Sequence, residues 1–390
     1  MQFIDLKAQQ NQIISKGLTL RDDIENNIKK VIDHGQYIQG PEVKELENIL
    51  SNYVGVKNCI SISSGTDALL VSLMALDIKR NDEVITTPFS FFATAEVIAL
   101  LGAKPAFVDI DKISYNIDSR KIEQAITTKT KAIIAVSLYG QTADLKSINK
   151  IANKYNIPVI EDGAQSFGAS HHNKKSCGLS TIGTTSFFPS KPLGGYGDGG
   201  ACFTNNDELA NRIREISLHG QIKRYSHNRI GINGRLDTIQ AAILLSKMKI
   251  LDQEIIARGE IAEKYIREFN KYGFSQVPII YKENTSVFAQ FTIQVDDREK
   301  IINDLKKKNI PTSIHYPSLL PDQNALNSPK SKLNFLKKIF YKKQYKSFNL
   351  DNSKNASKRV LSLPMHPCLK YDEQKFIVKS VIESVFSKSK

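Results

Sequence analysis

The chain has 390 residues, of which 41% are hydrophobic and 24% are charged. This length exceeds the usual size of a single core and the composition excludes a disordered protein, so we expect one large and one smaller domain. The four cysteines lie far apart without metal-ligand spacing, which indicates reduced thiols and no metal site.

The net charge of +14 is unevenly distributed along the chain. Residues 330 to 359 include ten basic side chains and one acid. We interpret the stretch from about 325 to 360 as a lysine-rich surface insertion. A nucleic-acid-binding or regulatory protein is the alternative from a different class, although the sequence shows no basic helix-turn-helix and no interleaved aromatic pattern.

The amino-terminal residues show no basic region followed by a long apolar stretch. No run of about 18 apolar residues occurs anywhere in the sequence. The sequence therefore predicts neither a signal peptide nor membrane insertion, and the expected location is the cytoplasm.

Short β-branched segments alternate with helical patterns between about residues 55 and 205. The expected strands span 58–63, 83–87, 105–110, 132–139, 157–162, 184–188 and 201–204. Helical spacing of apolar residues marks 66–78, 93–102 and 145–155. This alternation predicts an α/β fold with a mainly parallel sheet, whose ligands bind beyond the carboxyl ends of the strands.

A single long helical pattern, residues 236 to about 269, leads out of this first domain. After it, residues 287–295 are typical of a strand and 298–310 of a helix. We therefore expect a large domain over residues 1–250 and a small carboxyl-terminal domain over 251–390.

Four features follow strands and could share one site. The first is SSGTDALL (63–70), where backbone N–H groups at a helix start could bind phosphate, although a simple helix cap is an alternative. The second is Asp162, at the end of the apolar segment IPVIED. A buried acid there needs a cation, such as a protonated pyridine nitrogen, unless it only caps the next segment.

The third feature is SFFPSKPLGGYGDGG (186–200), a turn with one lysine, Lys191. A lysine with a lowered pKa can bind an aldehyde cofactor covalently, whereas a solvated surface lysine is the alternative. The fourth is a polar loop before a helix, which contains Asn233 and Arg235. Arginine suits bidentate recognition of carboxylate or phosphate, but Arg235 could instead pair with Asp237.

Together these motifs resemble the sugar aminotransferases of the DegT/DnrJ/EryC1/StrS family. The similarity runs from FIDLKAQQ and GQYIQGPEVKELE through VSLYGQTADL and EDGAQSFGA to HYP (315–317) and LSLPMHPCL. It implies the aspartate aminotransferase fold (PLP fold type I), with a mainly parallel seven-stranded sheet, helices on both faces and a smaller α+β carboxyl-terminal domain. It also implies pyridoxal 5'-phosphate as cofactor and a homodimer with active sites at the subunit interface.

The resemblance assigns roles to individual positions. Lys191 matches the lysine that binds the cofactor, Asp162 matches the partner of the pyridine nitrogen, and Gln165 lies beside the cofactor. The other matches are phosphate ligands, a ring-stacking aromatic and substrate contacts. They are Gly65, Thr66 and Ser186 for the phosphate, Asn233 for the phosphate of the other subunit, Phe91 for the ring, and Arg235, His315 and Tyr316 for the substrate.

Within the family, the sequence is most similar to the group acting on UDP-2-acetamido-2-deoxy-3-oxo-D-glucuronate in surface polysaccharide (O-antigen) biosynthesis, with L-glutamate as amino donor. Another UDP- or dTDP-linked 3- or 4-keto sugar is the alternative substrate. Related dehydratases carry histidine in place of the cofactor lysine, so Lys191 argues against that activity. Two departures from the family are Gly163, where a slightly larger residue is usual and which we expect to be tolerated, and the longer lysine-rich insertion.

Overall fold

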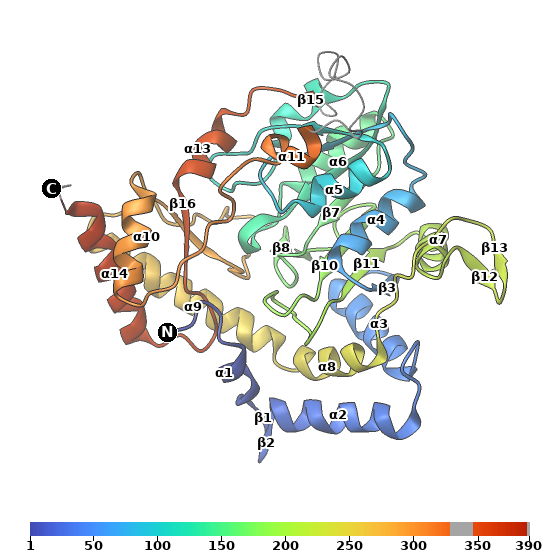
Figure 1. Ribbon diagram of the computed structural model, residues 1–390, viewed down its shortest axis with the longest axis horizontal. Helices are drawn as coiled ribbons and strands as arrows, with labels where there is room; N and C mark the ends of the chain where they lie inside the picture. Colours follow the sequence, from blue (N-terminus) through green and yellow to red (C-terminus); the bar gives the residue numbers. More distant parts are fainter. Residues whose placement is uncertain (328–345, 388–390) are drawn as a thin grey trace.

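We analysed a computed structural model, which describes residues 1–327 and 346–387. Seven apolar segments of the first half form the central sheet (Figure 1). They are β3 (Asn58–Ile62), β4 (Glu83–Thr86), β5 (Lys104–Phe107), β6 (Thr130–Val136), β7 (Val159–Asp162), β10 (Ile182–Ser186) and β11 (Gly200–Thr204). The expected mainly parallel seven-stranded sheet is confirmed, and a short eighth strand, β15 (Lys346–Ser347), extends its edge.

The order of strands in this sheet is β15-β5-β4-β6-β7-β10-β11-β3. Strand β11 runs antiparallel to both β10 and β3, and the other pairs are parallel. Asp162, Ser186 and the residues after Ile62 therefore lie at the same edge of the sheet, beyond the carboxyl ends of β7, β10 and β3. This is the edge where ligands bind in such sheets.

Helices cover both faces of the sheet because successive strand residues point to opposite sides. Ile134 of β6 packs with Val71 and Val97, whereas its neighbour Ile133 packs with Ile148 on the other face. The larger helices around the sheet are α2 (Leu20–His34), α3 (Pro41–Val54), α4 (Gly65–Ala75), α5 (Ala93–Leu100), α6 (Leu145–Lys154), α7 (Asp207–Ser217) and α8 (Thr238–Met248).

Short elements complete this half of the molecule. They are α1 (Leu6–Gln10) and the strand pairs β1 (Ile13–Ser15) with β2 (Leu18–Thr19), β8 (Ser170–His171) with β9 (Lys174–Lys175), and β12 (Gln221–Lys223) with β13 (Ser226–His227). The β12–β13 hairpin projects away from the sheet at the right of Figure 1. Its tip exposes Tyr225, which is 80% accessible to solvent.

The expected single helix from 236 to 269 is wrong, because the chain forms two helices there, α8 and α9 (Leu251–Asn270). The backbone N–H groups of Lys249 and Ile250 donate to carbonyls three residues earlier, which closes a tight turn between them. Apolar spacing continues across the turn, so the pattern alone did not reveal it.

A second core forms beyond α8 from α9, β14 (Phe291–Gln294), α10 (Arg298–Lys307), β16 (Val360–Leu363) and α14 (Tyr371–Phe386). Strands β14 and β16 pair antiparallel, and Tyr265, Phe269 and Phe291 stack at its centre. The chain between α10 and β16 returns to the central sheet, where Leu319 and Leu350 pack with Phe107.

The lysine-rich segment lies largely in this part of the chain, between α10 and β16. Residues 328–345 lie outside the described residues, whereas α11 (Asn324–Asn327) precedes them and α13 (Asp351–Arg359) follows β15. The start of α13 is held by Asp109, whose buried carboxylate accepts from the backbone N–H groups of Asn352 and Ser353 at 3.0 and 2.9 Å. Within 1–327 and 346–387, no helix is long and apolar enough to cross a membrane.

Candidate active site

The ends of two neighbouring parallel strands define the site. Asp162 ends β7 and pairs in register with Thr184 of β10, which ends two residues later at Ser186. The chain then turns, and the Lys191 N–H donates to the Phe188 carbonyl at 2.8 Å. Burial lowers the pKa of Lys191, and the Asp162 carboxylate opposes this shift through its charge. The lysine and the acid are therefore electrostatic neighbours, as their sequence positions predicted.

Asp162 is buried, with 7% of its surface accessible. Its carboxylate accepts from Thr94 Oγ1 at 3.3 Å and from the Ala164 N–H at 3.2 Å. Burial raises its pKa above the ordinary value, although these two hydrogen bonds and the charge of Lys191 oppose that shift. The protein thus leaves this carboxylate short of stabilising charge, which a bound cation would supply.

Helix α4 begins beside the end of β10. Ser64 caps this helix by accepting from the Asp67 N–H at 3.0 Å. Gly65 lies so close to Ser186 that a Cβ atom on it would stand 2.6 Å from the Ser186 Cβ. Only glycine permits this approach, which brings Gly65, Thr66 and Ser186 together at a helix N-terminus, a favourable place for a phosphate.

A polar and aromatic wall faces the strand ends. Gln165 accepts from the Tyr139 N–H at 2.9 Å and donates to the Tyr316 hydroxyl at 3.1 Å. The ring of Phe91 lies 6.5 Å from that of Tyr316, tilted by 40°, and Phe91 itself is 59% exposed. An exposed aromatic ring at this position is available to stack on a ligand.

His315 precedes Tyr316 and is held by β16. Its Nδ1 lies 2.9 Å from Ser362 Oγ, and the Tyr139 hydroxyl donates to its carbonyl. Burial lowers the pKa of His315 to about 4, and the nearby charge of Lys191 acts in the same direction. His315 is therefore neutral at physiological pH, so it can exchange hydrogen bonds without adding charge.

Asn233 and Arg235 form a separate group. Arg235 Nη2 donates to Asn233 Oδ1, and the intervening Gly234 carbonyl accepts from the Ser63 N–H at 3.0 Å. The partner of Arg235 is thus an amide and not Asp237. Asn233 is exposed, and within the described chain neither residue forms a hydrogen bond or an ion pair with Lys191.

Three residues of this arrangement had no role assigned from the sequence: Thr94, Tyr139 and Ser362. Tyr139 and Ser362 lie in segments that supported the family resemblance, but their partners are more than 20 residues away. Thr94 follows Phe91 by three residues, and its contact with Asp162 depends on the place of β7 in the sheet, between β6 and β10. The sequence pattern alone does not predict such contacts between distant segments.

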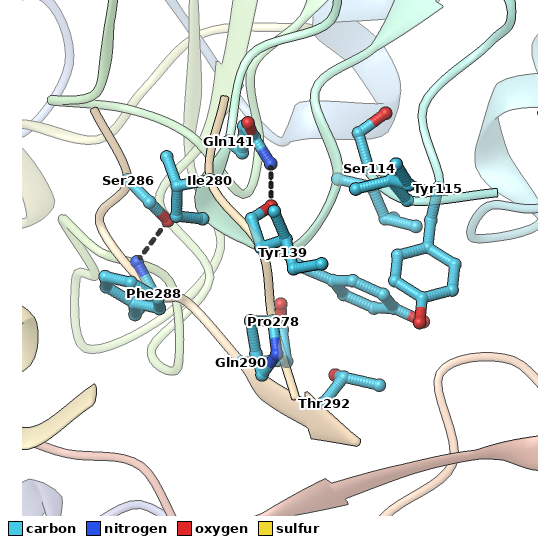
Figure 2. A pocket seen from close by; sticks show the side chains of 13 residues that line it. Ser114, Tyr115, Tyr139, Gln141, Pro278, Ile280, Ser286, Phe288, Gln290 and Thr292 are labelled. Atoms are coloured by element: carbon cyan, nitrogen blue, oxygen red, sulfur yellow. Dashed lines mark hydrogen bonds between the residues drawn. The ribbon is translucent and has the colours of Figure 1, made fainter. Parts of the chain in front are cut away.

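A small cavity is lined by Tyr139, and Lys191 is not among its lining residues (Figure 2). Tyr115 and Tyr139 meet edge to face on one side, with ring centroids 5.4 Å apart. Gln141 closes another side by donating to the Ile279 carbonyl at 3.2 Å. The cavity measures about 20 Å³, which suits one water molecule and is too small for a cofactor.

The geometry defines a class of protein. A lysine in the turn after one strand, a buried carboxylate ending the adjacent strand and a helix N-terminus beside both are arranged on a mainly parallel sheet with a second, smaller core. These are the features of an aminotransferase-type enzyme with the aspartate aminotransferase fold, PLP fold type I.

The chain belongs to the DegT/DnrJ/EryC1/StrS aminotransferase family, whose model matches residues 19–382. It is 52% identical over 369 residues to a UDP-2-acetamido-2-deoxy-3-oxo-D-glucuronate aminotransferase of Pseudomonas aeruginosa, covering 95% of this chain and 96% of that protein. A DegT DnrJ EryC1 StrS aminotransferase structure from Brucella abortus superposes with a TM-score of 0.90 and 38% identity, covering 99% and 100% of the two chains. A structure from Bacillus subtilis with bound cofactor PMP has a TM-score of 0.83 and 32% identity, covering 94% and 82%.

Proposed function

We propose that the protein transfers the amino group of L-glutamate to UDP-2-acetamido-2-deoxy-3-oxo-D-glucuronate, with pyridoxal phosphate as cofactor. The product would be UDP-2-acetamido-3-amino-2,3-dideoxy-D-glucuronate, a precursor for surface polysaccharide such as O-antigen. The observation that carries this proposal is Lys191 beside the buried carboxylate of Asp162, in a chain so similar to the Pseudomonas enzyme. The basic net charge alone supports the nucleic-acid-binding or regulatory alternative.

The site residues fit the cofactor. The Asp162 carboxylate has its pKa raised by burial, so a protonated pyridine nitrogen would offset a real deficit of positive charge. The N-terminus of α4 with Gly65, Thr66 and Ser186 suits the phosphate, and Phe91 suits the ring face. When bound, the cofactor supplies an aldehyde for the amine of Lys191 and an electron sink for carbanion chemistry.

Lys191 does two tasks in this mechanism. Its Nζ would hold the cofactor, and the same amine would take the proton from the α-carbon of the amino donor. Burial favours the neutral amine that both tasks require, since it lowers the pKa of Lys191. Neutral His315 lies near this amine, and the hydroxyl of Tyr316 lies near Asp162, so both can orient the substrates.

The carboxylate of the sugar gives Arg235 a role in substrate choice. Its Nη2 is paired with the neutral Asn233 amide, so its positive charge is not neutralised by that contact. Glutamate and a uronate sugar each bring a carboxylate that a guanidinium can bind with two hydrogen bonds. A 6-deoxy sugar would leave the same charge facing a methyl group, which is costly in a closing site.

The test compares the reverse reaction on UDP-2-acetamido-3-amino-2,3-dideoxy-D-glucuronate and on a UDP-4-amino-6-deoxy sugar. We expect wild type to prefer the uronate, and Arg235→Ala to lose about 10- to 100-fold in kcat/KM on it, because a charge-assisted pair contributes about 1.5–3 kcal/mol. Preference for the 4-amino sugar, or normal handling of the uronate by Arg235→Ala, would reject this substrate and leave the aminotransferase activity in place. A UDP- or dTDP-linked 3- or 4-keto sugar would then be the alternative.

We also propose that the active unit is a homodimer. Asn233 is exposed, and within the described chain it forms no hydrogen bond with Lys191, which supports a role in the phosphate site of a partner subunit. The exposed Tyr37 and Ile38, beside the Asp237 backbone, add an apolar surface near the same loop.

Mixing two inactive variants tests the shared site. Lys191→Ala and Asn233→Ala subunits, refolded together, should regain about a quarter of wild-type activity. Half of randomly formed dimers are mixed, and each mixed dimer has one intact site. Each variant refolded alone is the control. Absence of recovery in dimers shown by tagging to be mixed would mean that each chain builds its own site.

A further inference from the structure

A basic hollow lies between α6 and the β8–β9 hairpin, outside the site described above. These elements follow β6 and β7 in the chain and can be located in Figure 1. The hollow has a volume of about 580 Å³, within the range of small-molecule sites. None of its lining residues belongs to the set around Lys191. The lining consists of Leu145, Lys146, Asn149, Lys150, Asn153, His171, His172, Lys174 and Leu179.

One face of α6 supplies much of this lining. Lys146, Asn149, Lys150 and Asn153 recur every three or four residues, so their side chains lie on one side of the helix. The opposite side is buried through Leu145, Ile148 and Ala152. Across the hollow, β9 adds Lys174, and within the described chain none of the three lysines forms an ion pair.

His171 is a buried polar side chain in the lining of the hollow. It is 3% exposed, and its Nδ1 lies 2.6 Å from Asn284 Oδ1. The Asn284 amide nitrogen already donates to Gln141 Oε1 at 3.0 Å, so its oxygen faces the histidine and Nδ1 must be the donor. The other nitrogen, Nε2, is buried and has no hydrogen-bond partner in the described chain.

The charged groups near His171 favour an anion. Asp144 Oδ1 lies 3.8 Å from Nε2, too far for a hydrogen bond, and is the one carboxylate within 4 Å of this nitrogen in the described chain. Lys146, Lys150 and Lys174 outnumber it, and His172 adds a further ring beside His171. With Nδ1 donating, Nε2 is the acceptor of the ring and can accept a hydrogen bond from the hydroxyl of a phosphate group.

We propose that this hollow binds a small soluble anion carrying a phosphate or diphosphate group. The three lysine ammonium groups supply the charge, the Asn149 and Asn153 side chains lie along the same helix face, and His171 Nε2 accepts from a phosphate hydroxyl. The site is separate from the cofactor phosphate, because it shares no residue with the N-terminus of α4.

Isothermal titration of pyrophosphate into the holoenzyme tests the proposal. We expect one site per chain whose affinity falls at least about tenfold in Lys146→Ala/Lys150→Ala and several-fold in His171→Phe, since two charges and one hydrogen-bond acceptor are removed. The matched control is Lys131→Ala/Lys306→Ala, which removes the same charge from exposed positions elsewhere and should bind as wild type. Melting temperatures show whether each variant is folded.

Two results would overturn the proposal. They are no binding of millimolar pyrophosphate to wild type and unchanged affinity in Lys146→Ala/Lys150→Ala. Equal weakening of pyrophosphate binding in Lys131→Ala/Lys306→Ala would show nonspecific attraction to a basic protein. It would also contradict a specific binding site in the hollow.

Discussion

Lys191→Ala is expected to abolish transamination, with a loss of at least about 10⁴-fold in the half-reaction with L-glutamate. Alanine removes both the amine that binds the cofactor and the base that moves the α-proton, and a positioned base alone contributes about 10²–10⁴-fold. Stopped-flow absorbance of the purified enzyme, mixed with glutamate, measures the rate. Borohydride reduction of wild type followed by peptide mapping should locate the cofactor on Lys191.

Lys191→Arg is the matched control for charge. Arginine keeps a cation at this position but stays protonated, so it can neither bind an aldehyde nor accept a proton. We expect it to be as inactive as Lys191→Ala while melting near wild type. A reduced adduct on any other lysine, or more than about a tenth of wild-type activity in either variant, would contradict the role of Lys191.

Much of the fold follows from the apolar pattern of the chain. Strand β6 was expected over 132–139 and forms over Thr130–Val136, because its β-branched residues are buried on both faces. The break between α8 and α9 was not expected, since apolar residues on both sides of it keep helical spacing. The strand β15 was also missed, because two residues at a sheet edge leave no periodic signal.

The residues expected to carry the chemistry could be predicted from the sequence, whereas the residues that hold them in place could not. Asp162 and Lys191 each follow a strand, and parallel strands bring such positions to one edge. The contacts of Gln165 with Tyr139 and Tyr316 span 26 and 151 residues, so they depend on tertiary packing. The roles of all these residues in binding and catalysis stay predictions.

Gly163 shows how one departure from the family pattern is accommodated. A Cβ atom at this position would lie 2.4 Å from Cys177 Sγ and 3.0 Å from Ser176 Oγ. The glycine thus provides the space that the cysteine fills, beside the strand end that carries Asp162. A larger residue at 163 would require a smaller one at 177, a coupling that the two positions reveal only in three dimensions.

Asp162→Asn is expected to lower the rate of the glutamate half-reaction by about 10- to 10³-fold. A carboxylate within about 4–6 Å raises the pKa of a cationic partner by about 1–3 units, so its loss leaves the ring nitrogen of the cofactor largely unprotonated at neutral pH. Each unit corresponds to about 1.36 kcal/mol of lost stabilisation. The pH dependence of cofactor absorbance should shift toward lower pH in the variant, because the protonated form then persists only in more acidic solution.

Glu161→Gln is the matched control, because Glu161 is the preceding residue of β7 and points to the opposite face. Its buried carboxylate accepts from Ser176 Oγ at 2.6 Å and from the Cys177 N–H at 2.8 Å, away from Lys191. We expect Glu161→Gln to lower the melting temperature, since an amide nitrogen would replace one acceptor, and to leave the absorbance profile unchanged. If both variants shifted the profile equally, general disruption of β7 would explain the effect. If Asp162→Asn left profile and rate unchanged, the carboxylate would not act on the cofactor nitrogen.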